Sequence, residues 1–280
     1  MTGKLFLVGT PIGNLKDITL RALETLKNCD IIAAEDTRQT LKLLNRYEIK
    51  KKLISYHKFN ENAKSEDIIK LIEEGNNIAL VTDAGMPGIS DPGSVIVKQC
   101  IQKDICFEII PGATALITAL VYSGLDTTGF TFKGFLPKEN KDKKEVINEI
   151  KNLKGTIIFY EAPHRLNKTL QFLFENIGNR KVAICKELTK LHENIKRTTL
   201  VEAIEFYSEN EPRGEYVIAL SGKTDEEIQI ESMELWKDIS VEDHILMYIN
   251  RGKAKKEAVK LVAKDRKLSK NEVYKFSLNI

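Results

Sequence analysis

Short apolar runs alternate with amphipathic segments along the first part of the chain. The apolar runs have the length of buried strands, and they predict strands at residues 5–8, 31–34, 53–56, 78–81 and 105–110. Between the strands, apolar residues recur every three or four positions, as from Ile18 to Leu26, which predicts helices. This alternation is typical of an α/β domain with a largely parallel sheet.

The pattern restarts after Pro111. Residues 115–122 predict a helix that leads into a second unit. Further strands, with helices between them, are expected at residues 130–135, 156–160, 182–185 and 216–220. We therefore expect an N-terminal α/β domain at residues 1–115 and a second α/β domain at residues 116–222.

The composition changes again after Gly222, so residues 223–280 form a third part. Residues 223–238 carry mostly acidic charges and predict a linker. Short helices are expected next, one capped by Ser240 and another opened by the capping box that begins at Ser269. From residue 240 onward ten basic residues stand against five acidic ones, which favours contact with nucleic-acid phosphates. The alternative is a small docking bundle with a basic exterior.

Charge and cysteine content narrow the class of protein. The formal net charge of +3 neither favours nor excludes a polyanionic partner. The four cysteines lack metal-ligand spacing, so we expect no metal site and interpret them as buried thiols in a reducing compartment. No apolar run approaches membrane-spanning length, and no leader pattern precedes the first strand. We expect a soluble cytoplasmic protein without membrane contact.

The loop at residues 82–93 is the most informative stretch. It follows an apolar strand and contains three glycines, which give backbone freedom, and two prolines, which restrict it. We expect a rigid loop that presents backbone groups at the C-terminal end of a strand, where ligands bind in open α/β sheets. A plain strand-to-helix turn is the alternative, although such a turn needs fewer of these residues.

Polar side chains follow several other predicted strands. Residues 35–38 could transfer protons or anchor a polar substrate, or Asp36 or Thr37 could cap a helix with Arg38 paired to Glu35. Residues 160–165 and 186–193 bring acids, histidines and basic side chains to two strand ends, which indicates a polar cleft. The glycine-proline loop at residues 9–15 matches neither the dinucleotide fingerprint nor the P-loop.

Taken in order, these motifs resemble the tetrapyrrole methylase superfamily, the class III S-adenosylmethionine (SAM)-dependent methyltransferases. The resembling stretches are GTPIGNL (9–15), AEDTR (34–38), DAGMPGISDPG (83–93), PGATA (111–115), GFLP (134–137), FYEAPHR (159–165), KELTKLHE (186–193) and GEY (214–216). Within the superfamily the motifs are closest to those of the enzymes that methylate small-subunit ribosomal RNA. The resemblance implies a two-domain α/β methyltransferase with a small C-terminal helical module, SAM in the cleft between the domains, and a homodimer.

The resemblance also implies the reaction and the donor site. The reaction is methylation of the ribose 2′-hydroxyl of a cytidine in the decoding region of 16S rRNA, with the assembled small ribosomal subunit as a plausible partner. Small tetrapyrrole-methylating relatives often carry an acid where Met86 stands, so their contacts at that position do not transfer unchanged. The residues at matching donor-binding positions are Pro11, Ile12, Gly85, Met86, Pro87, Ile89, Thr114, Ala115, Tyr160, Leu188 and Tyr216.

A ribose hydroxyl is a poor nucleophile until its proton leaves, so we expect a general base. The candidates at motif positions are Glu161, His164, Glu187, His192 and Glu193, with Asp36 behind them. Arg38, Arg165 and Lys190, together with Asp36, are the expected substrate-binding residues, the basic ones on phosphates. Alanine at Glu161 or His192 is expected to lower turnover more than SAM affinity.

Two other functions stay open at this point. One is methylation of a small tetrapyrrole or of a protein side chain on the same fold, against which the basic tail weighs. The other is a non-catalytic RNA-binding assembly factor that uses the tail alone, which would leave the polar loops of both domains without a purpose.

Overall fold

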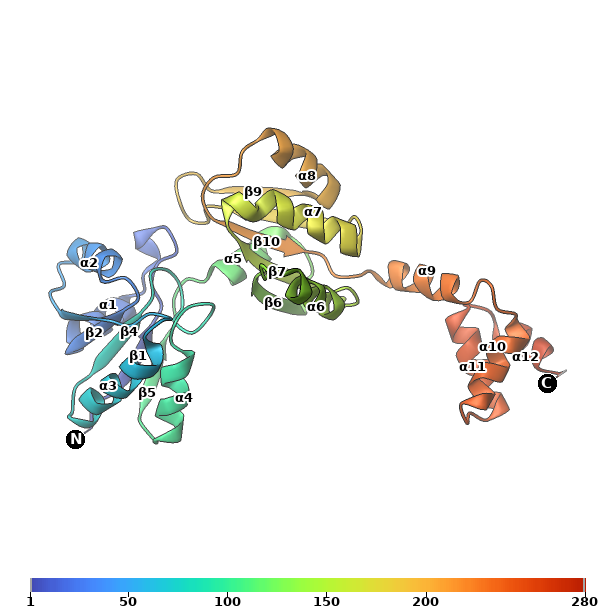
Figure 1. Ribbon diagram of the computed structural model, residues 1–280, viewed down its shortest axis with the longest axis horizontal. Helices are drawn as coiled ribbons and strands as arrows, with labels where there is room; N and C mark the ends of the chain where they lie inside the picture. The colour runs from blue at the N-terminus through green and yellow to red at the C-terminus, as the bar shows by residue number, and fades with distance from the viewer. Residues whose placement is uncertain (1, 279) are drawn as a thin grey trace. The chain divides into compact units, whose positions relative to one another are not determined.

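A computed structural model describes residues 2–278 and 280 of the chain. The chain divides into two compact units, one of residues up to 148 together with 155–221, the other of residues 149–154 and 222–280. The first unit holds two five-stranded sheets with helices on them, and the second is helical (Figure 1). The expected α/β class with a C-terminal helical module is thereby confirmed.

The first sheet is entirely parallel. Its strands, in the spatial order β3-β2-β4-β1-β5, are β1 (Leu5–Val8), β2 (Ile31–Ala34), β3 (Lys52–Ser55), β4 (Ile78–Val81) and β5 (Phe107–Ile110). Strand β4 lies in the middle, and β1 lies between β4 and β5, with Leu5 opposite both Ile78 and Phe107. All five strands therefore end at one edge, and the loops that follow them share that edge.

Two layers of helix cover this sheet because side chains alternate across it. Leu5 and Leu7 point to the face covered by α3 (Glu61–Glu73) and α4 (Ser94–Gln102). Val8 points to the opposite face, covered by α1 (Leu20–Asn28) and α2 (Thr37–Arg46). Strands β1, β2 and β4 are buried on both faces, which is why they appear as continuous apolar runs in the sequence.

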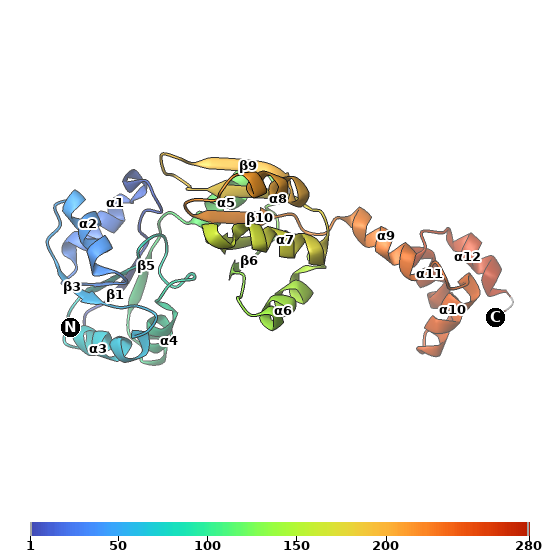
Figure 2. The same ribbon diagram turned by 45° about the horizontal axis from the view of Figure 1, so that its top comes forward.

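The second sheet is mixed. Its strands, in the spatial order β6-β7-β10-β8-β9, are β6 (Phe130–Phe135), β7 (Thr156–Glu161), β8 (Lys181–Lys186), β9 (Asn194–Thr199) and β10 (Tyr216–Leu220). Strand β10 is antiparallel to both β7 and β8, so its start lies at the same edge as their ends. Helix α5 (Ala115–Ser123) packs on one face, and α6 (Asn140–Ile150), α7 (Leu166–Ile177) and α8 (Leu200–Glu209) complete this part (Figure 2).

Three expectations need correction. Strand β9 was not predicted, because this edge strand is mostly polar and carries no apolar run. Residues 223–238 are not a plain linker: they contain α9 (Asp225–Leu235), where Thr224 and Glu227 cap each other reciprocally with N–O distances of 3.1 and 2.7 Å. Cys106 is exposed, whereas Cys29, Cys100 and Cys185 are buried as expected.

The C-terminal module consists of α9, α10 (Val241–Asn250), α11 (Lys255–Asp265) and α12 (Lys270–Ser277). Ser240 caps α10, and Ser269 with Glu272 forms a capping box on α12, as predicted. Ile245 and Val262 belong to its small apolar core. Among the described residues, no helix combines the length and the apolar character needed to cross a membrane.

His244 is buried at the centre of this module. Its ring stacks on Trp236 with a centroid distance of 3.7 Å, and its Nδ1 accepts a hydrogen bond of 3.1 Å from Arg266 Nε. Burial, followed by the charge of Arg266, lowers the pKa of His244 from its ordinary value of 6.5.

We expect acid to destabilise the module through His244. The folded state holds this histidine neutral, so its contribution to stability is complete above pH 6.5 and is lost as the pH falls below that value. Trp236 is the only tryptophan in the sequence, so its fluorescence follows unfolding of this module during urea titrations at pH 5 and pH 8. His244→Gln should flatten the pH dependence. Equal unfolding midpoints for the unmodified chain at both pH values would contradict the expectation.

Candidate functional site

Two loops at the edge of the first sheet are joined directly. Thr10, after β1, and Gly85, after β4, form an antiparallel bridge with N–O distances of 2.8 and 3.2 Å. The Thr10 hydroxyl also donates to the carbonyl of Thr82 at 3.2 Å. The two loops thus form one wall rather than two independent flaps.

The loop after β4 folds back on itself. Gly85 and Gly93 have φ angles of +80° and +141°, which side-chain-bearing residues rarely adopt. A Cβ at Gly93 would lie 2.9 Å from the backbone nitrogen of Gly88, so the loop closes tightly at its base. Ser90 takes a left-handed φ of 66°, a strained conformation for serine.

Close backbone approaches fix further walls of the site. A Cβ at Gly112 would lie 2.9 Å from the carbonyl carbon of Gly9, so the β1 and β5 loops are in direct contact. Gly13 faces the loop that follows β8, because its Cβ would lie 2.8 Å from the carbonyl oxygen of Leu188. The backbone N–H of Asn14 donates to the Thr189 hydroxyl at 3.0 Å.

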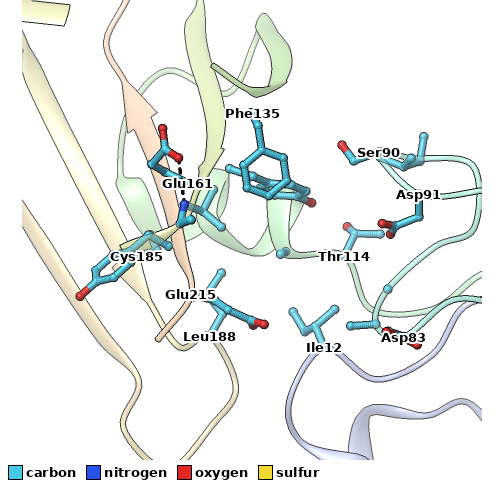
Figure 3. Close-up of a pocket in the computed structure, with 18 of the residues that line it drawn as sticks. Ile12, Asp83, Ser90, Asp91, Thr114, Phe135, Glu161, Cys185, Leu188 and Glu215 are labelled. Atoms are coloured by element: carbon cyan, nitrogen blue, oxygen red, sulfur yellow. Dashed lines mark hydrogen bonds between the residues drawn. The ribbon is translucent and has the colours of Figure 1, made fainter. Parts of the chain in front are cut away.

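A pocket of about 410 Å³ lies where these loops meet the edge of the second sheet. Its lining comes from the loops after β1, β2, β4 and β5 and from the adjoining ends of β6, β7, β8 and β10. Figure 3 shows Phe135 and Leu188 on the side of the second sheet and Asp83 and Ser90 on the side of the first. Its volume falls in the range of roughly 300–1,000 Å³ that small-molecule sites occupy.

Most residues predicted to bind a donor line this pocket. They are Ile12, Gly85, Met86, Ile89, Thr114, Ala115, Tyr160, Leu188 and Tyr216. Pro11 and Pro87 are not part of the lining and belong to the loops behind it. Tyr160 packs edge-to-face against Phe132 and Phe135, which fixes its ring on the wall.

Glu161 lines the pocket, but its carboxylate is engaged by protein groups. Oε1 accepts the N–H of Ala162 at 2.9 Å and lies 3.3 Å from Nε of Arg165, while Oε2 accepts the Thr169 hydroxyl at 2.6 Å. Arg165 also donates to the carbonyl of Leu136. This buried network ties the end of β7 to the short helix η2 (Pro163–Arg165) and to α7.

The other base candidates lie outside the pocket lining. His164 and His192 are exposed. Glu187 accepts from Lys190 at 3.0 Å and from the N–H of Glu215 at 2.8 Å. These hydrogen bonds outweigh burial and lower the pKa of Glu187. Glu193 accepts the N–H of Thr189 at 2.7 Å and the Tyr122 hydroxyl at 3.1 Å.

The predicted substrate-binding residues are also paired. Lys190 bridges Glu187 and Glu215 at 3.0 and 2.8 Å. Asp36 caps α2 and pairs with Arg38 at 2.7 Å, so Arg38 does not pair with Glu35. The bond from Arg38 lowers the pKa of Asp36 to about 2.

Three carboxylates of the pocket were missed as a group by sequence reasoning: Glu35, Asp83 and Asp91. Burial is the leading cause that raises the pKa of each, and for Asp91 it acts together with the charges of Glu35 and Asp83 to bring the pKa to about 7. Two of the three follow neighbouring parallel strands, β2 and β4, which is the signal that could have revealed the cluster.

Comparison with known proteins decides the family. The family model for tetrapyrrole (corrin/porphyrin) methylases matches residues 4–204. The chain is 47% identical over 273 residues to ribosomal RNA small subunit methyltransferase I of Halalkalibacterium halodurans, covering 97% of this chain and 93% of that relative. The chain belongs to the ribosomal RNA small subunit methyltransferase I family, within the tetrapyrrole methylases. The Bacillus subtilis member is 46% identical over 272 residues, with 97% and 93% coverage.

A shorter member of this family matches a smaller share of the chain. Ribosomal RNA small subunit methyltransferase I of Thermotoga maritima is 46% identical over 221 residues, which are 79% of this chain and 99% of that relative. Among solved structures, diphthine synthase has a TM-score of 0.64 at 15% identity, covering 79% of this chain and 91% of its own. The cobalt precorrin-4 methyltransferase CbiF has a TM-score of 0.59 at 19% identity, covering 78% and 94%. At these identities the structural neighbours establish the fold.

Proposed function

We propose that this chain transfers a methyl group from SAM to the ribose 2′-oxygen of a cytidine in the decoding region of 16S rRNA, within the small ribosomal subunit. The observation that carries the proposal is the match along 97% of the chain to relatives named as small-subunit rRNA methyltransferases. The pocket supports it, because nine of the residues at donor-binding motif positions line one cavity.

The pocket fits SAM by size and by chemistry. Its walls include apolar side chains such as Ile12, Met86 and Leu188, which suit the flat adenine and the methionine chain. Gly85 has no side chain and so keeps the bridged wall open. A Cβ at this position would lie 3.5 Å from Cγ2 of Ile12 and would narrow the cavity. Carboxylates on one side suit a ligand that carries positive charge.

SAM supplies an electrophilic methyl group on a sulfonium, and transfer is an in-line displacement by the ribose oxygen. The loops after β1, β4 and β5 hold a ligand in one orientation because they are joined to one another. Tyr160, Phe135 and Ile89 line the cavity, and their apolar surfaces would shield a bound donor from water. The protein must also accept the hydroxyl proton.

For the RNA, the predicted contacts remain Arg38, Arg165 and Lys190 with Asp36. Arg38 is the most available of them, since its side chain is 87% exposed while it stays paired with Asp36. The exposed basic residues of α11 and α12 support a further contact with phosphates, which would be sequence-independent and salt-dependent.

We also propose a cytoplasmic homodimer. Helix α5 leaves Ile117 and Val121 exposed at 44% and 71%, and the edge strand β5 leaves Ile109 exposed at 44%. Apolar side chains gathered on one helix are typical of an interface. Light scattering on Val121→Glu should report a monomer if α5 lies in that interface.

The experiment that tests the function is transfer of labelled methyl from SAM to small subunits lacking the modification, followed by nucleotide mapping. We expect label on one cytidine ribose. Label on a porphyrinoid or on a protein side chain, with none on RNA, would favour a tetrapyrrole- or protein-methylating enzyme instead. SAM binding without transfer to any acceptor would favour the assembly factor.

A further inference from the structure

Asp91 differs from every other carboxylate that lines the pocket. Glu161 is held by Ala162, Arg165 and Thr169, and Glu215 by Lys190 at 2.8 Å. Asp83 accepts the N–H of Asp36 at 3.1 Å, and Glu35 lies 3.4 Å from the N–H of Asp83. Among the described residues, the Asp91 carboxylate has no hydrogen-bond donor or cation as partner, and Figure 3 shows it pointing from its loop toward the cavity.

The surroundings of Asp91 favour its neutral form. It is partly buried, and the ionisable groups that face it are Glu35 and Asp83 at the neighbouring strand ends and the Tyr160 hydroxyl across the pocket. Burial first, and then the charges of Glu35 and Asp83, raise the pKa of Asp91 to about 7. A base is most effective when its pKa lies near the working pH, so this carboxylate can both take and release a proton.

We propose that Asp91 is the residue that accepts the proton of the acceptor hydroxyl during methyl transfer. The inference rests on the proposed function. The O–H bond breaks toward the Asp91 carboxylate, an O–CH₃ bond forms, and the S–CH₃ bond breaks with its electron pair left on sulfur. The proton then leaves Asp91 for water. The structure thereby places the base on the β4 loop, in the N-terminal half of the site, rather than among the candidates on β7 and β8.

The first test is Asp91→Asn, which keeps the shape and removes the basic oxygen. We expect the single-turnover rate on small subunits to fall by roughly 10²–10⁴-fold, the usual contribution of a general base. Binding of SAM, measured by calorimetry at pH 8, should change by less than about threefold, because Glu35 and Asp83 remain as carboxylates beside the cationic donor. Asp67→Asn is the matched control, because Asp67 is an exposed partner of Lys64 on α3.

The pH dependence gives a second, independent measurement. The rate should rise with pH through an acid limb near the pKa of Asp91, and Glu35→Gln should move that limb to lower pH by removing a like charge. In the free protein, carbon-13 NMR of the Asp91 carboxyl should show titration near pH 7 without any turnover. Because the folded pKa lies above the ordinary 3.8, folding stability should fall as pH rises from about 4 to 7. Asp91→Asn should make that fall smaller, and the raised pKa values of Glu35 and Asp83 account for the part that stays.

These results separate the inference from the function on which it rests. If the unmodified protein methylates the subunit and Asp91→Asn does so at the same rate, the inference is wrong and the function stands. If Asp91→Asn instead loses SAM affinity at an unchanged rate, Asp91 binds the donor and is not the base. If the unmodified protein methylates no RNA, the proposed function fails, whatever the NMR titration shows.

Discussion

Gly112→Ala is expected to weaken SAM binding by at least about tenfold and to destabilise the fold. The added methyl carbon would lie 2.9 Å from both the carbonyl carbon and the oxygen of Gly9. Neither backbone segment can move away easily, because the N–H of Gly9 donates to the carbonyl oxygen of Ile110 at 2.9 Å and Thr10 is bridged to Gly85. Overpacking of this kind costs about 1–3 kcal/mol, and the shift displaces Thr114 and Ala115 from the pocket wall.

Urea unfolding and calorimetric SAM titration measure the two parts of this result. Gly129→Ala is the matched control, because no atom lies within 4 Å of a Cβ at that position and its φ is not left-handed. We expect Gly129→Ala to stay within about 0.5 kcal/mol of the unmodified protein. Unchanged SAM affinity in Gly112→Ala would show that the contact between the β1 and β5 loops does not shape the donor site.

The second large effect is expected at Glu161. Alanine at this position removes the buried carboxylate. The Arg165 guanidinium loses its ion-pair partner, and the Thr169 hydroxyl and the Ala162 N–H lose their hydrogen-bond acceptor. Removing one partner of a buried ion pair costs about 3–5 kcal/mol. The structure therefore changes the sequence-based expectation, because Glu161→Ala should lower stability and SAM binding together rather than turnover alone.

Urea unfolding at pH 7.5 checks the Glu161 prediction, with Glu161→Gln as the conservative variant. Glutamine retains one acceptor oxygen and should recover part of the lost stability. Glu205→Ala on the exposed side of α8 is the control and should change stability by no more than about 0.5 kcal/mol. If Glu161→Ala unfolds like the unmodified protein yet turns over far more slowly, Glu161 is the base and Asp91 is not.

The sequence was sufficient for the architecture because burial and periodicity agree in it. Strands β1, β2 and β4 are covered on both faces and therefore appear as apolar runs. Strand β9 lies at a sheet edge, where alternating polar side chains are tolerated, so no such run marks it. Helix α9 was missed because its acidic first turn looks like a linker, although acids suit a helix N-terminus.

The loops that form the site could be predicted from the sequence, but the roles of the individual side chains could not. Met86 and Ile89 could be assigned to the pocket because glycine and proline define the shape of their loop. Which carboxylate is paired depends on partners that only the fold brings near. Glu161 accepts a hydrogen bond from Thr169 on α7, whereas the charges of Glu35 and Asp83 act on Asp91. Neither outcome can be read from the local sequence.

The position of β10 has a consequence for how the chain matures. This strand is the last of the second sheet in sequence, yet it lies between β7 and β8 at the centre. The Asn14–Thr189 hydrogen bond likewise joins residues 175 positions apart. Contacts between residues so far apart in the sequence form slowly. Until they form, unpaired strand edges are exposed and can aggregate with other chains. A nascent chain cannot complete its second sheet until residue 220 has left the ribosome. Chains whose synthesis stops before that residue should therefore bind chaperones and be degraded by proteases more than full-length chains.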